Sequence, residues 1–388
     1  MSASPRFKSP CSSAVLALCL MLANPRSGRA ENALSYKYED YSEADGRIGV
    51  TTQIALLDQD LGPDSHVKVQ GVIDAIAGAS PNGQPAPAGS DQVPLTALRD
   101  RRKAWNVNFS HQFSTTNLDL GVAHSRESDY VSKGWSINTL TDFNQKNTTL
   151  LAGVAGTDDK VKVFYQSSWS GKRTNDVIVG VTQLLDPHTS VSFDLTWGHA
   201  TGYLSDPYKI VQKRTEVSPG NFLPLQFLEN RPGSRNKWIA LASLNHAFVD
   251  LRGAVEAGYR FYHDTFGTNA HTLELTWLQQ ISRTLILTPT LRLYEQSAAN
   301  FYYYNLDQTT ILPVEGSPPP QGPFYSSDYR LSALRTTSYG LKAVWSATAR
   351  LQIDLGVDRY DMRGKDSVTA RTAYPHATII TAGAKFIW

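Results

Sequence analysis

AYPHATIITAGAKFIW, from Ala373 to Trp388, is the stretch that decides the fold. Its even-numbered positions fall on one face of an extended chain, and from 378 onward they are Thr378, Ile380, Ala382, Ala384, Phe386 and Trp388. This alternation predicts an amphipathic β-strand. In a soluble sheet such a strand would be an exposed edge that invites aggregation, whereas in an outer-membrane barrel it pairs with the first strand. The stretch therefore predicts a closed barrel, with Phe386 and Trp388 at the closure.

The composition excludes a helical membrane protein. The chain has 388 residues, of which 41% are hydrophobic and 19% are charged, and its mean hydropathy is -0.31. A membrane-spanning helix needs about 20 mostly apolar residues. After residue 30 the longest candidate, Trp238 to Val249, is interrupted by Asn245 and His246. No composition break suggests a linker, so residues 31–388 are predicted to form one domain.

The N-terminal residues have the pattern of a cleaved secretory signal peptide. Arg6 and Lys8 precede the apolar stretch AVLALCLMLA, Ala14 to Ala23, and Gly28 and Ala30 place small residues at the positions expected before a cleavage site. Removal of residues 1–30 lowers the Lys and Arg count from 37 to 33 against 35 acids, so basicity gives no support for nucleic-acid binding. Both cysteines lie in this leader, which leaves no thiol for disulfides, metal sites or catalysis.

Alternation recurs along the rest of the chain. In 188–201, for example, Phe193, Leu195 and Trp197 alternate with polar or small residues, as in a strand with one face in lipid and one in a polar lumen. The pattern predicts an all-β, antiparallel, up-and-down transmembrane barrel of about 16 strands, with a range of 14 to 18. The predicted strands are 32–42, 47–58, 65–76, 103–114, 116–127, 130–143, 146–154, 173–185, 188–201, 235–248, 250–264, 268–281, 283–296, 331–347, 349–362 and 373–388.

Loop lengths and tryptophans agree with this interpretation. Short connections are predicted at 114–117, 143–146, 186–188, 249–250, 282–283 and 347–348, and long ones at 77–102, 155–172, 202–234 and 297–330. Short and long connections alternate, which is typical of barrels with short periplasmic turns and long extracellular loops. Tryptophans then fall near both membrane interfaces: Trp105, Trp197 and Trp238 at the outer one, Trp277, Trp345 and Trp388 at the inner one.

Four segments resemble a known family. They are VIDAIAGASP at 72–81, ENRP at 229–232 with Ser234 and Arg235, LRLY at 291–294 with QSAA at 296–299 and Phe301-Tyr302, and SDYRLS at 327–332. They are similar to those of an uncharacterised family of Gram-negative outer-membrane β-barrel proteins, over nearly the whole mature chain. The resemblance implies the barrel fold and an outer-membrane location, and it implies no substrate or reaction.

Charged residues on the inward phase are predicted to face the lumen. These are Lys68, Asp74, Asp119, Asp194, Glu256, Arg260, Glu274, Arg292, Lys342, Asp354, Asp358 and Lys385. A sixteen-stranded barrel is wide enough for a water-filled channel, so the set could line a pore and determine which ions or solutes it prefers. Mutual pairing of the same charges in a closed, stiffened barrel is an equally valid interpretation.

The long outer loops are the second candidate region. Aromatic residues next to arginines in 202–234 and 297–330 suit sugars or anionic organic solutes, although such loops also pack on barrel rims. The predicted mouth or constriction residues are Arg231, Arg235, Arg292, Gln296, Asp328 and Arg330.

The function predicted from the sequence is a channel for small polar solutes, with no enzymatic activity and no cofactor. An importer that passes hydrophobic ligands through the barrel wall is one alternative, with Pro289 marking a possible bulge, and a structural or partner-binding barrel is another. An outer-membrane hydrolase is the least favoured, because the outward His111 and His246 adjoin periplasmic turns. The predicted partners are outer-membrane lipid, the barrel-assembly machinery acting on the C-terminal strand, and an unidentified small solute.

Overall fold

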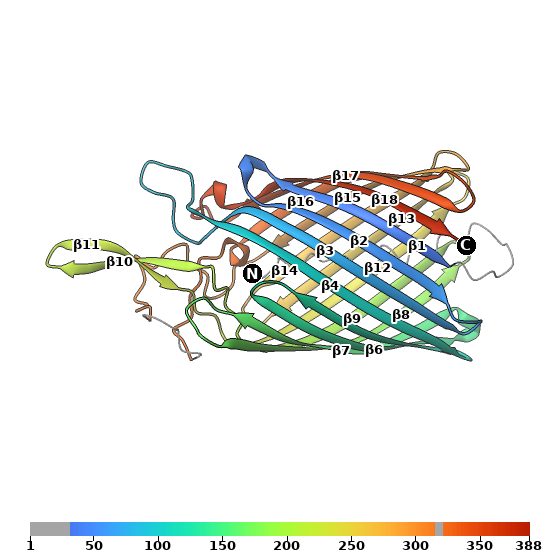
Figure 1. The fold of residues 1–388 in the computed structure, drawn as a ribbon, viewed down its shortest axis with the longest axis horizontal. Coiled ribbons are helices and arrows are strands. Elements are labelled where there is room, and N and C mark those ends of the chain that lie inside the picture. The colour runs from blue at the N-terminus through green and yellow to red at the C-terminus, as the bar shows by residue number, and fades with distance from the viewer. Residues whose placement is uncertain (1–31, 315–320) are drawn as a thin grey trace.

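The chain forms a closed barrel of sixteen antiparallel strands (Figure 1). The structure is a computed structural model that describes residues 32–314 and 321–388, so the predicted signal peptide lies outside the described residues. The barrel strands are β1 (Ala33–Glu43), β2 (Gly49–Asp60), β3 (Ser65–Pro81), β4 (Leu95–Phe113), β5 (Thr116–Arg126), β6 (Tyr130–Phe143), β7 (Thr148–Lys162), β8 (Trp169–Asp186), β9 (Thr189–Gly202), β12 (Ser234–Phe248), β13 (Gly253–Asp264), β14 (Asn269–Gln280), β15 (Leu285–Gln296), β16 (Leu334–Ser346), β17 (Leu351–Gly364) and β18 (His376–Ile387).

The first and last strands close the barrel as predicted. β1 pairs with β18 along its whole length, from Ala33 opposite Ile387 to Glu43 opposite Ala377. The backbone N–H of Trp388 adds a hydrogen bond of 3.0 Å to the carbonyl of Asn32. The fold class and the count of sixteen are therefore confirmed. Among the described residues, no helix is long and apolar enough to cross a membrane.

Two parts of the strand prediction are wrong. β3, β4, β7 and β8 extend well beyond their predicted ends, so half of the loop predicted at 77–102 and most of the loop predicted at 155–172 are strand. Their outer ends are rich in charge, as in Arg99 to Lys103, which hides the apolar alternation that marks a lipid-facing strand. The connection at 202–234 contains the hairpin of β10 (Ile210–Ser218) and β11 (Asn221–Leu228), which projects away from the barrel (Figure 1).

Alternation gives the barrel an apolar outer wall. Large apolar side chains such as Phe193, Leu195 and Trp197 are exposed on that wall, while the residues between them face inward. Four exposed tryptophans form an outer girdle, each eight to ten residues from the short-turn end of its strand: Trp105, Trp135, Trp197 and Trp238. This separation matches the strand length that crosses a bilayer, about 9 to 11 residues. Strand segments beyond the outer girdle therefore rise out of the apolar band.

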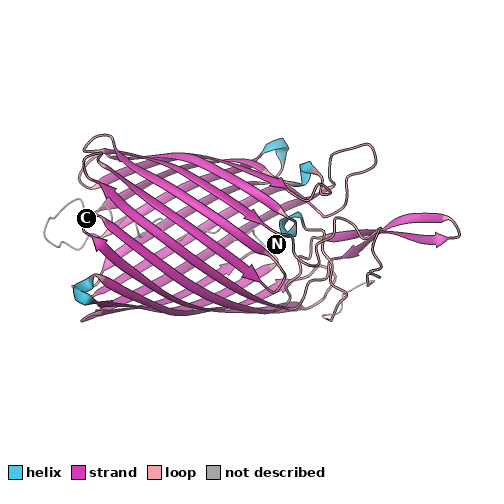
Figure 2. Cartoon of the chain, turned by 180° about the vertical axis from the view of Figure 1, so that it is seen from behind, coloured by secondary structure: helices cyan, strands magenta, loops and turns pink. Residues whose placement is uncertain are grey.

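The largest buried apolar clusters lie in the loops at one end of the barrel. Figure 2 shows the long connections gathered at that end and the short turns at the other. Each of three clusters joins residues from different connections, as where Val93 of the β3–β4 loop packs with Tyr374 of the β17–β18 loop. Phe266 and Phe301 form the centre of a second cluster, with their rings edge to face at 4.9 Å. The long loops thus have a packed interior of their own.

Candidate functional site

The connections 82–94, 203–233, 297–314, 321–333 and 365–375 fold together at the long-loop end, and we name this assembly the cap. Its apolar clusters are supplemented by polar contacts between loops, such as the hydrogen bond from the Asn230 side chain to the Pro323 carbonyl, 2.8 Å. Tyr325 is fully buried and is hydrogen-bonded through its backbone to Asn230 in both directions. The cap is therefore a folded structure at the barrel mouth.

Six charged side chains form an ion network inside the cap, and we name this network the clasp. Its members are Asp206, Lys209, Glu229, Arg231, Asp328 and Arg330. Arg330 binds Asp328 at 2.6 Å and Asp206 at 2.5 Å, while Arg231 binds Asp328 at 2.8 Å. Three carboxylates meet three cations, so the clasp is electrically balanced.

Burial governs the electrostatics of the clasp. Burial alone would raise the pKa of Asp328, but the guanidinium groups of Arg330 and Arg231 outweigh it and hold that pKa well below its usual range. Burial is the main cause of the raised pKa of Glu229, and it also lowers the pKa of Lys209. The Asp328 carboxylate therefore remains charged because two arginines surround it.

The clasp connects separate elements. Lys209 donates to the carbonyl of Pro81 at the end of β3, and Ser326 donates to Glu229 at 2.5 Å. Gln296, the last residue of β15, donates to the carbonyls of Arg330 and Ser332 at 2.9 and 2.8 Å. These bonds fix the β9–β12 and β15–β16 connections to the rim of the barrel.

The structure distributes the six predicted mouth residues over three sites. Arg231, Asp328 and Arg330 are members of the clasp, and Gln296 supports it. Arg235 instead binds the fully buried Asp264 and lies over the ring of Phe266 at 4.5 Å. Arg292 lies inside the barrel. The aromatic loop residue Phe301 is buried in the cap, so its ring does not form the ligand platform suggested by the sequence.

The predicted lumen residues lie on the inner phase of their strands, and many are paired there. Arg292 binds Glu274 at 2.9 Å, Arg102 binds Asp74 at 2.5 Å, and Lys342 approaches Asp354 at 4.0 Å. Other contacts involve the side chains of Lys68 with Asp58, Asp119 with Asn108 and Asn138, and Arg260 with Thr272. Asp194 and Asp358 lie over glycines of the adjacent strand, and Glu256 and Lys385 share the inner phase.

Several residues of these sites escaped the sequence prediction. The sequence predicts a loop at Arg102, because the apolar alternation of β4 starts only after this residue. In the structure Arg102 lies on β4 directly opposite Asp74, on the same inner face. Lys237 binds Asp176 across β12 and β8 at 3.0 Å, and alternation in both strands could have revealed them. Glu229 and Lys209 lie in irregular connections, where no periodic signal indicates burial.

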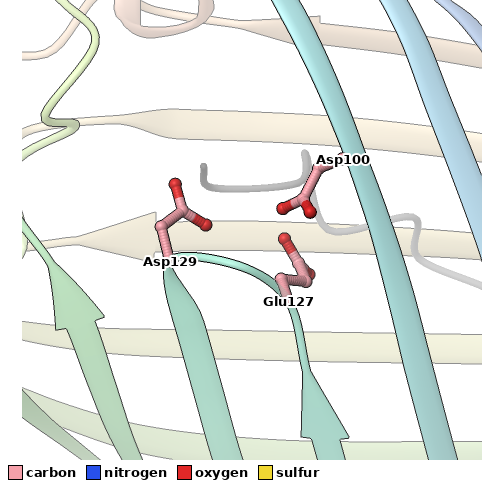
Figure 3. Close-up of side chains that lie close together, drawn as sticks. All are labelled: Asp100, Glu127 and Asp129. Carbon is pink, nitrogen blue, oxygen red and sulfur yellow. The ribbon is translucent and has the colours of Figure 1, made fainter.

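Three carboxylates meet beside the barrel rim. Asp100 of β4 and Glu127 and Asp129 of the β5–β6 turn point toward one another (Figure 3), with one oxygen of each within 4.8 Å of the others. Carboxylate oxygens are the ligands that Ca²⁺ prefers. However, Tyr208 donates to Asp129, and the backbone N–H of Ser128 donates to Asp100. The group therefore has structural contacts as well as cation-binding chemistry.

Glu127 gives this cluster an expected pH response. Burial, and next the charge of Asp100, raise the pKa of Glu127 from 4.5 to about 7. Because the folded pKa exceeds the unfolded one, ionisation destabilises the turn, with no cost below about pH 4.5 and the full cost above about pH 7. We expect hydrogen exchange at residues 127–130 to accelerate as pH rises from about 5 to about 8, beyond its intrinsic pH dependence, and Glu127→Gln to abolish that excess. Asp91→Asn, a change in an exposed loop carboxylate, is the control. An unchanged excess in Glu127→Gln would contradict the assignment.

Comparison with known proteins gives similarity in fold at low sequence identity. A mutant of the ferric enterobactin receptor PfeA from Pseudomonas aeruginosa has a TM-score of 0.44 and 12% identity, covering 92% of this chain and 60% of the receptor. A bacterial polysaccharide outer membrane secretin has a TM-score of 0.48 and 8% identity, covering 92% of this chain and 98% of that one. A loop-deletion mutant of OmpT, an outer membrane protein of Vibrio cholerae, has a TM-score of 0.43 and 6% identity, covering 92% of this chain and 99% of that one. The chain thus spans about 60% of the receptor's length. No curated protein matches the sequence.

A family model matches most of the chain. The model described as Protein of unknown function (DUF3570) covers residues 11–170 and 164–382. The matched residues include the four segments on which the family resemblance rested. They also include the cap and every barrel strand, with only the last residues of β18 outside. The chain therefore belongs to the DUF3570 family, a family of unknown function.

Proposed function

We propose that the protein is an outer-membrane channel for small polar solutes, with the long loops outside and the cap narrowing the entrance. The observation that carries this proposal is the exposure of charged side chains on the inner face. The side chains of Lys68, Glu274 and Lys342 keep 53%, 44% and 34% of their surface exposed. Because the barrel is closed, the space beside these groups lies within the lumen, which supports a water-filled interior.

The lining predicts a pore that does not discriminate strongly between cationic and anionic solutes. Basic and acidic side chains both line the inner wall, and ion pairs such as Arg292 with Glu274 balance part of that charge locally. Selectivity in such a pore comes from size and from local charge rings. The cap adds a second filter, since its loops are packed together at the mouth.

An outer-membrane position is supported by the outer wall. Exposed apolar side chains form its band, and the outer girdle stands at one edge while Trp277, Trp345 and Trp388 stand near the short-turn ends. Trp and Tyr prefer membrane interfaces, where a ring meets both lipid and water. The same band would be unstable in water, which favours a bilayer as the surroundings.

A second candidate, passage of a hydrophobic ligand through the wall, has one supporting feature. The β14–β15 ladder pairs Thr276 with Thr290 and Gln279 with Leu287, and the two positions between them, around Pro289, are not paired. Proline has no N–H to donate to the ladder. The register is the same on both sides, so the bulge expected at Pro289 is absent. The feature is a local weakness in the wall without an opening.

Single-channel recording on the purified chain in planar bilayers tests the proposal. We expect stable conductance, because the exposed charged side chains of the inner face favour a water-filled lumen. Ligand-specific uptake without conductance would favour the wall route, and absence of both would favour a structural or partner-binding barrel. In either case the channel proposal would be wrong.

The ion pair between Arg292 and Glu274 provides the matched variants. Removing one charge leaves its partner unbalanced in the lumen, so Arg292→Gln should shift the reversal potential in a salt gradient toward cations and Glu274→Gln toward anions. The double exchange Arg292→Glu with Glu274→Arg should restore a reversal potential near that of the wild type. If neither single variant moves the reversal potential, this level of the barrel does not contact the permeating ions.

A further inference from the structure

The outer surface of β4 to β8 carries an unusual set of cations beyond the outer girdle. We name it the basic belt. Its members are Arg99, Arg101, Lys103, Arg126, Lys133, Lys160, Lys162 and Arg173. All eight are exposed. They belong to neighbouring strands, so the belt is one continuous surface on one side of the barrel.

Alternation places the belt on the outer wall. Lys103 and Arg101 are two and four residues from the exposed Trp105 on β4, and Lys133 is two residues from the exposed Trp135 on β6. An even number of residues along a strand returns to the same face. The pairings of β4 with β5, β5 with β6, β6 with β7 and β7 with β8 contain no register shift that would change the face.

Charges of opposite sign are sorted between the two faces of these strands. The acids Asp100, Asp159 and Asp176 lie on the inner phase, whereas Asp158 is the one acid on the outer phase of β4 to β8 beyond the girdle, among the residues with a described position. A surface with eight cations and one acid produces a strong positive potential. This separation of acids and cations distinguishes the belt from a barrel rim on which both charges are interspersed.

Among the described residues, the ion pairs of the belt include a single counter-charge on its own face, Asp158. Arg173 binds Asp158 at 3.4 Å, with 68% and 61% of the two side chains exposed, and such an exposed pair contributes little. Lys103 stands directly opposite Arg126 across the β4–β5 ladder, and like charges at directly opposite positions destabilise a sheet. An anion supplied from outside would relieve this repulsion.

The height of the belt identifies the source of the anion. Two residues along a tilted strand rise by about 5 Å, so Lys103 and Lys133 lie about 5 Å above the girdle and Arg101 about 10 Å above it. This is the level of lipid head groups. Beside the belt, below Arg173, an apolar groove of about 260 Å³ is lined by residues of β8, β9, β12 and β13, among them Val177, Trp197 and Trp238. At Arg173, the belt cation on a strand that lines the groove, a cation above apolar side chains matches a phosphorylated head group above an acyl chain.

We propose that the basic belt binds the phosphate groups of an anionic glycolipid in the outer leaflet. Lys and Arg pair with phosphate through charge-assisted hydrogen bonds, and each cation near an anionic surface adds to the attraction. The inference rests on the outer-membrane position in the proposed function, but it does not depend on conductance. The belt would fix the rotation and depth of the barrel in the lipid.

Native mass spectrometry of the full chain in neutral detergent tests the inference. The probe is bis-phosphorylated lipid A, and its dephosphorylated form is the comparison. The belt variant carries Gln at positions 101, 103, 126 and 133. The matched control carries Gln in place of four cations at the short-turn end, Lys146, Arg252, Arg283 and Arg350. Circular dichroism and heat-modifiable migration confirm that each variant is folded.

We expect the wild type and the control to bind the phosphorylated lipid at least about tenfold more tightly than the belt variant does. The dephosphorylated lipid should not distinguish the proteins, and high salt should weaken wild-type binding by screening. The inference would be overturned if the belt variant bound the phosphorylated lipid as tightly as the wild type does, or if the control lost as much affinity as the belt variant. It would also be overturned if the wild type bound soluble polyphosphate as tightly as the phosphorylated lipid. Conductance of the belt variant should match the wild type, so failure of lipid binding and failure of the channel proposal are separately visible.

Discussion

Replacing Asp328 with Asn should open the cap while the barrel stays in the membrane. Asp328 is 1% exposed and holds both Arg330 and Arg231 at 2.6 to 2.8 Å. Removing one member of a buried ion network leaves the other charges uncompensated, which costs about 3 to 5 kcal/mol. That cost is confined to the cap, because the strand ladder does not depend on the clasp. The substitution should therefore loosen residues 203–233 and 297–333 selectively.

Two measurements detect the opened cap. Limited proteolysis should cut the variant in those two connections while heat-modifiable migration stays normal, and mean conductance should rise because the mouth widens. Asp91→Asn removes an exposed loop carboxylate and should resemble the wild type in both. A protease-resistant cap in Asp328→Asn would show that the clasp does not hold the loops together.

The clasp should also respond to acid. The pKa of Asp328 is lowered in the folded chain from an unfolded value of 3.8, so its stabilisation is complete above that value. The stabilisation is lost as pH falls through the folded pKa. Glu229, whose pKa is raised, acts in the opposite direction at neutral pH. Strong acid should therefore reproduce the loosened loops of the Asp328 variant.

The combined replacement of Phe386 and Trp388 by Ser should prevent assembly of most of the protein. Phe386 lies opposite Leu34 on β1 and its ring stacks with that of Trp388 at 6.1 Å, with both rings exposed on the outer wall. Burial of each large apolar side chain in lipid is worth about 1.5 to 3 kcal/mol. The loss falls on the seam between the first and last strands, where an unpaired ladder leaves two edges.

Membrane fractionation and heat-modifiable migration measure this effect. Folded protein in the outer membrane should fall sharply in the double variant, with degraded or aggregated chain in its place. Trp169→Ser is the control, since Trp169 begins β8 at the tip of the β7–β8 hairpin, away from the seam. Normal levels of heat-modifiable protein in the double variant would contradict the closure argument.

The barrel was predictable from the sequence because its physical constraint is periodic. Lipid on one side and water on the other impose alternation on every spanning strand, and Phe193, Leu195 and Trp197 show it plainly. The outer ends of β4 and β7 lie beyond the apolar band. Arg99, Arg101 and Lys103 therefore occupy the outer-face positions of β4 there, and the apolar alternation that predicts a strand is missing. Strand pairing there depends on the adjacent strand, which one sequence does not reveal.

The candidate sites were predictable only in part. Arg231, Asp328 and Arg330 were recognised as residues of one region, but their enclosure in a balanced network depends on Glu229 and Lys209, which come from a connection without periodicity. The basic belt needed both the extended strands and the orientation of each side chain. In both cases, contacts between distant segments decide what the charges do.

The pairing of Ala33 with Ile387 also sets a rule for biogenesis. One edge of β1 has no partner until β18 has been made and has paired with it. A chain cut short by premature termination or proteolysis has nothing to join to that edge. Such a truncated chain keeps an exposed strand edge on β1, and this edge leaves it accessible to chaperones and proteases.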